Sequence, residues 1–180
     1  MESTDTIRQK LLNWYKPKHN FVGDNEPSFA SALQLVRLEQ QILMPISDAM
    51  GHITITYGFT SPALSRYIKR HAPKGTAPEL DQHACLEHNS RGKLICDRAG
   101  AACDFWVEGY EQNMHQVALF ICQRLSFDKL YFYGRNRPVH VSFAYEPLRH
   151  LQIMHQDQIG RRIPGKKAFG DASAQLAKEL

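Results

Sequence analysis

Prolines divide this chain into short segments, and that division limits what it can fold into more than any other feature. Pro45, Pro62, Pro138 and Pro147 each interrupt or open a patterned stretch, since proline cannot continue a helix or a central strand. No stretch reaches the roughly 18 uninterrupted apolar residues that a membrane span needs. The 180 residues, of which 43% are hydrophobic and 22% charged, are enough for one globular domain with its own core. We therefore expect a globular protein that does not cross a membrane.

Five stretches show helical patterns. In the longest, apolar residues recur at intervals of two to four residues between the capping residue Ser28 and Gly51. Pro45 predicts a kink within this helix. Ser61 and Pro62 mark the start of another helix, because proline is favoured in the first helical turn. The expected helices cover residues 4–15, 28–50, 61–71, 112–125 and 172–180.

Strand-like stretches alternate with these helices. The expected strands cover residues 52–57, 93–96, 101–107, 129–133 and 139–143, where β-branched and aromatic residues are frequent. Residues 72–90 form an unusually long loop, and loops beyond about 12–15 residues in a compact domain are commonly functional. This order of elements predicts an α+β fold with a small, mainly antiparallel sheet packed with helices.

The N-terminus lacks the apolar core of a secretory signal, so we expect a cytoplasmic protein. Disulfides are not expected in a reducing compartment, and the four cysteines become candidates for thiol or metal chemistry. Cys85, His88, Cys96 and Cys103 could form a zinc site, but Cys103 should point away from its neighbour Asp104. Buried thiols without a metal are therefore the preferred interpretation.

Two histidines and one aspartate form the constellation with the clearest chemistry. His83 lies in the long loop, whereas Asp104 and His140 lie in strand-like stretches. Alternation along neighbouring strands would aim the last two side chains at one face of the sheet. Two imidazoles and one carboxylate suit Zn²⁺ when the fourth position is left open for water. These three residues are therefore a candidate zinc site.

Four segments, in order, resemble the M15 family of zinc D,D- and L,D-peptidases, which has the hedgehog/D-Ala-D-Ala peptidase fold. The segments are LEQQILMPISDAMG, HITITYGFTSPALSRYI, DQH followed by GAACDF, and PVHVSF. They are similar to the family's leading helix, its strand and helix joined by SGYRSP, its SxHxxGxAxD motif, and its late histidine strand. The resemblance implies that fold, Zn²⁺ as the cofactor, a peptide or peptidoglycan-like substrate, and His83, Asp104 and His140 as the zinc ligands.

The resemblance covers most of the chain and suggests three parts. Residues 1–19 are expected to form an N-terminal helix, residues 20–146 the zinc domain, and residues 147–180 a basic C-terminal tail. The zinc domain is expected to contain one insertion hairpin at about residues 84–97.

The first metal ligand has an alternative. Twenty residues separate His83 from Asp104, where the family motif has six. Asp97 keeps the shorter spacing to Asp104 and would give a site with two carboxylates, which suits a harder metal. His83 is preferred because DQH lies where the family's SxH lies.

Two positions depart from the family in ways that affect catalysis. The family's substrate-binding arginine falls at Thr60, which cannot form a bidentate pair with a carboxylate. Its general base falls near Tyr133 or Arg137, and an arginine cannot accept a proton. The nearest carboxylates in sequence are Glu87, Glu108 and Glu146, and none has the spacing of a replacement base. Catalytic residues therefore stay unassigned, and Thr60 and Arg137 are the candidate substrate-binding positions.

Two functions follow from these observations. The first is a zinc-dependent peptidase- or amidase-like hydrolase acting on peptides with D-amino acids, such as a phage-type lysin. The second is an inactive metal-binding module, related to a phage or mobile element, that recognises a protein or nucleic-acid partner. The 22 basic residues exceed the 18 acidic ones, and the excess gathers in the last third of the chain. Such a basic face is usually solvated, and an anionic partner is the alternative.

Overall fold

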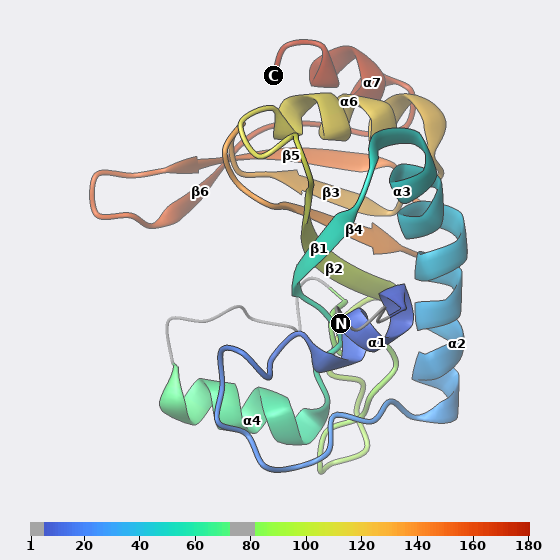
Figure 1. Ribbon diagram of the computed structural model, residues 1–180, viewed down its shortest axis with the longest axis vertical. Helices are drawn as coiled ribbons and strands as arrows, with labels where there is room; N and C mark the ends of the chain where they lie inside the picture. Colours follow the sequence, from blue (N-terminus) through green and yellow to red (C-terminus); the bar gives the residue numbers. More distant parts are fainter. Residues whose placement is uncertain (1–5, 73–81) are drawn as a thin grey trace.

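A six-stranded sheet organises the protein, and the computed structural model describes residues 6–72 and 82–180 (Figure 1). The strands are β1 (Ile53–Tyr57), β2 (Ala101–Val107), β3 (Lys129–Phe132), β4 (Val139–Phe143), β5 (His150–Gln156) and β6 (Arg162–Ala168). Their order across the sheet is β1-β2-β4-β3-β5-β6, and all neighbours are antiparallel except β3 and β5. This confirms the predicted α+β class with a mainly antiparallel sheet.

One face of the sheet carries the main hydrophobic core. The helices on this side are α2 (Phe29–Leu38), α3 (Met44–Met50), α6 (Met114–Arg124) and α7 (Ala172–Ala177) (Figure 1). Cys103, Phe105 and Val141 point into this core and are fully buried. Because successive strand residues point to opposite faces, Asp104 and His140 project from the other face.

The remaining helices lie near β1 and at the lower end of the molecule in Figure 1. Helix α1 (Ile7–Asn13) packs against β1, and α4 (Pro62–His71) stands apart from the sheet. Among the helices of the described residues, none is long and apolar enough to span a bilayer.

The predicted kink at Pro45 takes the form of a π-helical turn. This turn, η1 (Glu39–Leu43), joins α2 to α3. Pro45 lies in the first turn of α3, where its missing N–H breaks the regular ladder of hydrogen bonds. The wider π turn absorbs that interruption without ending the helical rod.

Side-chain caps fix where three helices begin. Ser28 and Ser61 cap α2 and α4 as predicted, each accepting the N–H of the residue three positions on. The first helix begins later than expected, at Ile7, because Thr6 and Gln9 form a capping box. The expected start of this helix at residue 4 lies outside the described residues.

The C-terminal part differs from the prediction. Residues 147–180 were expected to form a peripheral basic tail, but they contribute β5 and β6 to the sheet and end in α7. The parallel pairing of β5 with β3 places Leu151 beside Leu130, and both are fully buried in the core. The ribbon formed by β5 and β6 then projects from the body (Figure 1).

A buried carboxylate fastens the loop before β2 to the sheet. Asp128 is fully buried, and its Oδ2 accepts from Arg98 Nε at 2.7 Å and from Gln82 Nε2 at 3.1 Å. Its Oδ1 accepts from the Leu148 N–H at 3.0 Å. Losing these partners would leave a buried charge uncompensated, which is costly. Residues 82–100, the described part of the loop that contains His83, are therefore held by Gln82 and by Arg98.

The predicted insertion hairpin occurs in a reduced form within this loop. A single antiparallel bridge joins His88 to Leu94, and the turn between them is closed by the Gly92 N–H donating to the Asn89 carbonyl at 3.0 Å. The strand expected at residues 93–96 is absent, because the pairing stops after this one bridge.

Gly100 brings the end of the loop against β4. Its φ is 144°, and a Cβ there would lie 2.0 Å from the Phe143 carbonyl oxygen. Gly109 also has a positive φ, 81°, but a Cβ there would meet nothing within 4 Å.

We expect Gly100→Ala to lower the free energy of unfolding by at least about 3 kcal/mol and Gly109→Ala by about 1 kcal/mol, since only Gly100→Ala adds a collision to backbone strain. Urea denaturation measures both, and equal losses would contradict this packing.

Candidate metal centre

Asp104 and His140 lie opposite each other on paired strands. Asp104 on β2 is in register with His140 on β4. The same row continues to Tyr57 on β1 and to Tyr131 on β3. Directly paired residues project to the same face of a sheet, so these four side chains form one row on the face opposite the main core. The predicted convergence of Asp104 and His140 is confirmed.

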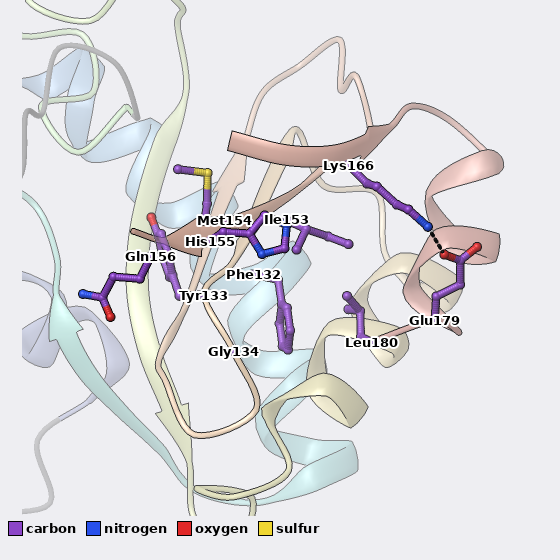
Figure 2. A pocket seen from close by; sticks show the side chains of 10 residues that line it. All are labelled: Phe132, Tyr133, Gly134, Ile153, Met154, His155, Gln156, Lys166, Glu179 and Leu180. Atoms are coloured by element: carbon purple, nitrogen blue, oxygen red, sulfur yellow. Dashed lines mark hydrogen bonds and ion pairs between the residues drawn. The ribbon is translucent and has the colours of Figure 1, made fainter. Parts of the chain in front are cut away.

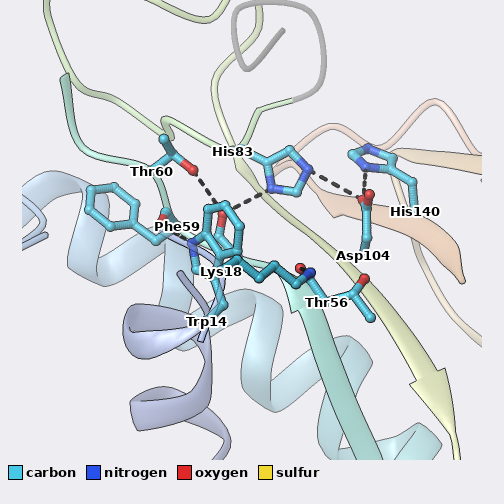
Figure 3. A network of polar contacts seen from close by, with 9 residues as sticks. Trp14, Lys18, Thr56, Phe59, Thr60, His83, Asp104 and His140 are labelled. Atoms are coloured by element: carbon cyan, nitrogen blue, oxygen red, sulfur yellow. Dashed lines mark hydrogen bonds and ion pairs between the residues drawn. The ribbon is translucent and has the colours of Figure 1, made fainter. Parts of the chain in front are cut away.

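His83 reaches this row from the loop before β2 (Figure 3). Its Nε2 lies 3.3 Å from Asp104 Oδ1, and His140 Nδ1 lies 2.8 Å from the same oxygen. Both imidazoles are fully buried, whereas 14% of the Asp104 side chain is exposed. The cluster therefore reaches solvent at the carboxylate.

The chain that follows β1 fixes the position of His83. Its Nδ1 lies 3.0 Å from the Gly58 carbonyl oxygen, and its own carbonyl accepts the Thr60 N–H at 3.1 Å. A carbonyl can only accept, so Nδ1 carries a proton, and Nε2 is the nitrogen that faces Asp104. Gly58 itself lies against α1, where a Cβ would be 2.3 Å from the Leu11 carbonyl oxygen.

Aromatic rings pack against both imidazoles. Tyr57 meets His83 edge to face, with ring centroids 4.4 Å apart. Tyr131 stacks on His140, with centroids 4.7 Å apart and planes 17° from parallel. These contacts restrict the two rings to the orientations that face Asp104, as a preorganised site requires.

The charge on Asp104 is stabilised where it lies. Burial alone would raise the pKa of Asp104, but hydrogen bonds from His140 and His83, and the positive charge these rings can carry, hold that pKa well below its usual range. Asp104 is therefore a carboxylate, the form that ligates a metal.

Lys18 is a further charged residue at the centre, and sequence analysis missed it. Its ammonium donates to the Thr56 carbonyl at 2.5 Å and extends below Asp104 (Figure 3). Burial lowers the pKa of Lys18, and the nearby Asp104 charge opposes that shift. No motif marks Lys18, because its proximity to Asp104 arises only when the segment after α1 folds back along β1.

The donor set fits zinc. Zinc bonds of about 2.0–2.1 Å place the donors of a tetrahedral site roughly 3.3 Å apart, and the distance from His83 Nε2 to Asp104 Oδ1 is 3.3 Å. The ligating atoms of His83, Asp104 and His140 all lie within 4.8 Å of one another. His140 Nε2 is buried and has no hydrogen-bond partner among the described residues, and such an atom in a folded protein calls for an explanation.

The other candidate ligands are not part of this centre. Within residues 6–72 and 82–180, His83, Asp104 and His140 are the only group of histidines, cysteines and acids with metal-binding spacing, so Asp97 does not join it. All four cysteines are buried and unbridged. Burial raises the pKa of Cys85 and Cys103 well above the usual range, and that of Cys122 to about 12. The thiols of Cys85, Cys103 and Cys122 are therefore protonated.

The two candidate substrate-binding residues differ in accessibility. Thr60 is fully buried, and its hydroxyl donates to the Gly58 carbonyl at 3.3 Å. It therefore supports the His83 loop and has no surface to offer a substrate. Arg137 is exposed in the turn before β4 and lines a cavity of about 180 Å³.

Three cavities among the described residues, of about 470, 180 and 280 Å³, are not lined by the metal-ligand candidates. The cavity of about 470 Å³ lies between β3, β5 and the C-terminus (Figure 2). A metal ion and a water need little space, so the convergence of donor atoms, and not a large cavity, defines the candidate site.

Comparisons with protein-family models, with curated proteins and with solved structures found no match. The resemblance to M15 peptidases therefore rests on the sequence motifs alone.

We expect the protein to bind one zinc ion per chain. His83→Ala, Asp104→Asn and His140→Ala should each weaken zinc binding by at least about 100-fold, because each removes a ligand. Competition with a chromophoric chelator measures the affinity, and elemental analysis measures the stoichiometry.

Asp97→Asn is the matched control, since it changes the alternative first ligand and should leave zinc affinity unchanged. Loss of zinc in Asp97→Asn with full retention in His83→Ala would contradict the assignment.

Proposed function

We propose that this protein is a zinc-dependent hydrolase of peptide or amide bonds, of the D,D- or L,D-peptidase type. The observation that carries the proposal is the convergence of His83, Asp104 and His140. These residues come from a loop and two strands, and 20 residues separate the first two. The resemblance implied this ligand set, and the fold brings it together despite the insertion.

Zinc in this centre would supply Lewis acidity, polarising a substrate carbonyl and lowering the pKa of a bound water toward about 7. The chain contributes the environment for that chemistry. Buried His83 and His140 are held by the Gly58 carbonyl and by Tyr131. Asp104 forms the solvent-facing side of the centre.

Lys18 is the residue best placed to bind a reacting oxygen. Its ammonium lies beside Asp104 and carries donors beyond the one used by the Thr56 carbonyl. A preorganised cation next to the metal stabilises negative charge that develops on a substrate carbonyl. Lys18, which would stabilise this charge, lies far from the motifs in the sequence.

A second candidate function is a metal-binding module that recognises a partner without hydrolysing it. Two observations favour this module. Arg137 lies at the position of the family's base, and no carboxylate besides Asp104 belongs to the centre among the described residues. Glu87, one of the alternative bases, instead accepts the Ser28 N–H at the start of α2 at 2.8 Å.

Zinc-loaded protein should release the terminal residue from peptidoglycan fragments that contain D-amino acids, and His140→Ala should reduce the rate by at least about 1,000-fold, because it disrupts the metal centre. Mass spectrometry of the products measures turnover. Stoichiometric zinc without turnover of peptidoglycan, D,D-peptide or L,D-peptide substrates would reject the hydrolase and support the non-hydrolytic module.

Lys18→Ala should keep zinc at full stoichiometry and lower kcat/KM by about 100-fold, since it removes one donor to the developing charge. Lys16→Ala is the matched control, because Lys16 is an exposed lysine two residues away. Equal activity of the two variants would show that Lys18 has no part in the reaction.

A further inference from the structure

Two arginines meet beside an aromatic ring near the turn that joins β5 to β6. The Arg162 guanidinium lies over the Tyr133 ring, 4.0 Å from its centroid. Arg137 reaches the same place from the turn between β3 and β4. Both arginines and Tyr133 line the cavity of about 180 Å³, whose other lining residues are Pro138, Met154, His155 and Gln156.

Arg137 and Arg162 have no anionic partner among the described residues, unlike Arg161 and Lys166. Within the described residues, neither Arg137 nor Arg162 forms an ion pair, whereas Arg161 lies 3.3 Å from Asp157 and Lys166 lies 2.9 Å from Glu179. Two adjacent guanidinium groups repel each other unless an anion lies between them. The Tyr133 ring holds one of them in place through its π face.

This cluster lies on the same face of the sheet as the metal centre. Tyr131 stacks on His140, and Tyr133, two residues further along the chain, lies under Arg162. Residues two apart along a strand share a face and are separated by about 7 Å. Figure 2 shows Tyr133 and Gln156 together, on the side away from Phe132 and Leu180. A ligand bound at the centre can therefore extend along β3 to reach both arginines.

We propose that Arg137 and Arg162 form an oxyanion-binding subsite that holds an anionic group of the substrate about one dipeptide length from the metal centre. A planar guanidinium binds carboxylate or phosphate oxygens through two parallel N–H donors. The cavity accommodates one such group, since its volume is about 180 Å³. The role of this subsite in a reaction rests on the proposed function. Anion binding by the two arginines does not, because it needs no metal.

The test is an NMR titration of the full chain, following the amide and arginine side-chain signals. Acetyl-D-alanyl-D-alanine with a free carboxylate should bind at least about tenfold more tightly than the same peptide with a C-terminal amide. Arg137→Gln and Arg162→Gln should each remove that preference, because each loses a charge-assisted pair of hydrogen bonds. Inorganic phosphate, titrated separately, shows whether the subsite also takes phosphate.

Arg161→Gln is the matched control, because Arg161 neighbours Arg162 but is already paired with Asp157. It should bind the free acid like the wild type. An equal loss in Arg161→Gln and Arg162→Gln, with tight and salt-dependent binding of a 20-nucleotide DNA, would instead identify a general polyanion surface. Unchanged carboxylate preference in Arg137→Gln and Arg162→Gln would also overturn the subsite.

The same titration with His140→Ala separates this proposal from the proposed function. Anion binding that persists in His140→Ala but is lost in Arg162→Gln supports the subsite, even if the protein hydrolyses nothing. Loss of anion binding in His140→Ala as well would mean that the anion binds at the metal centre, which would contradict the subsite.

Discussion

His83 and His140 both contact a single oxygen of Asp104, and this contact joins a loop to two neighbouring strands of the sheet. Two of the three residues are fixed by strand register, since Asp104 and His140 are direct neighbours on β2 and β4. The third is fixed by a loop, through the hydrogen bond of His83 to the Gly58 carbonyl. Three independent segments must therefore fold before the cluster exists, so the site reports on the whole fold.

The loop is the demanding part of this arrangement. Extending a loop costs little entropy, because the cost rises only with the logarithm of its length. Precise placement of one side chain in it needs anchors, and Asp128 supplies them by binding Gln82 just before His83 and Arg98 at the far end. A buried aspartate outside the metal centre thereby determines where a metal ligand lies.

Sequence predicted the centre of the fold better than its edges. Strand alternation predicted that Asp104 and His140 share one face of the sheet and that Cys103 lies on the other, because successive residues of a strand point to opposite faces. The ribbon of β5 and β6 was missed since β6 is mostly exposed and polar, and exposed edge strands need no apolar alternation. The π turn before Pro45 was predicted only as a kink. The sequence shows that Pro45 lacks an N–H for a helical hydrogen bond, but it does not show how the backbone adjusts to that loss.

The charged residues around the centre were the hardest to predict. Lys18 comes close to Asp104 through tertiary folding, and Arg162 approaches Tyr133 only because residues 150–168 join the sheet. Conversely, Thr60 was placed by motif alignment as a substrate-binding residue and is buried in the support of His83. Motif position thus predicted the convergence of the metal-ligand candidates but not the exposure of the substrate-binding candidate Thr60, since convergence is set by the fold and substrate contacts by the surface.

X-ray absorption spectroscopy at the zinc edge of the purified protein distinguishes zinc bound by His83, Asp104 and His140 from zinc bound by cysteines. Coordination by His83, Asp104 and His140 predicts a first shell of nitrogen and oxygen atoms at about 2.0–2.1 Å, with imidazole scattering from two histidines. A sulfur shell at about 2.3 Å would assign the metal to the cysteines, and protein that binds no zinc would contradict the account entirely.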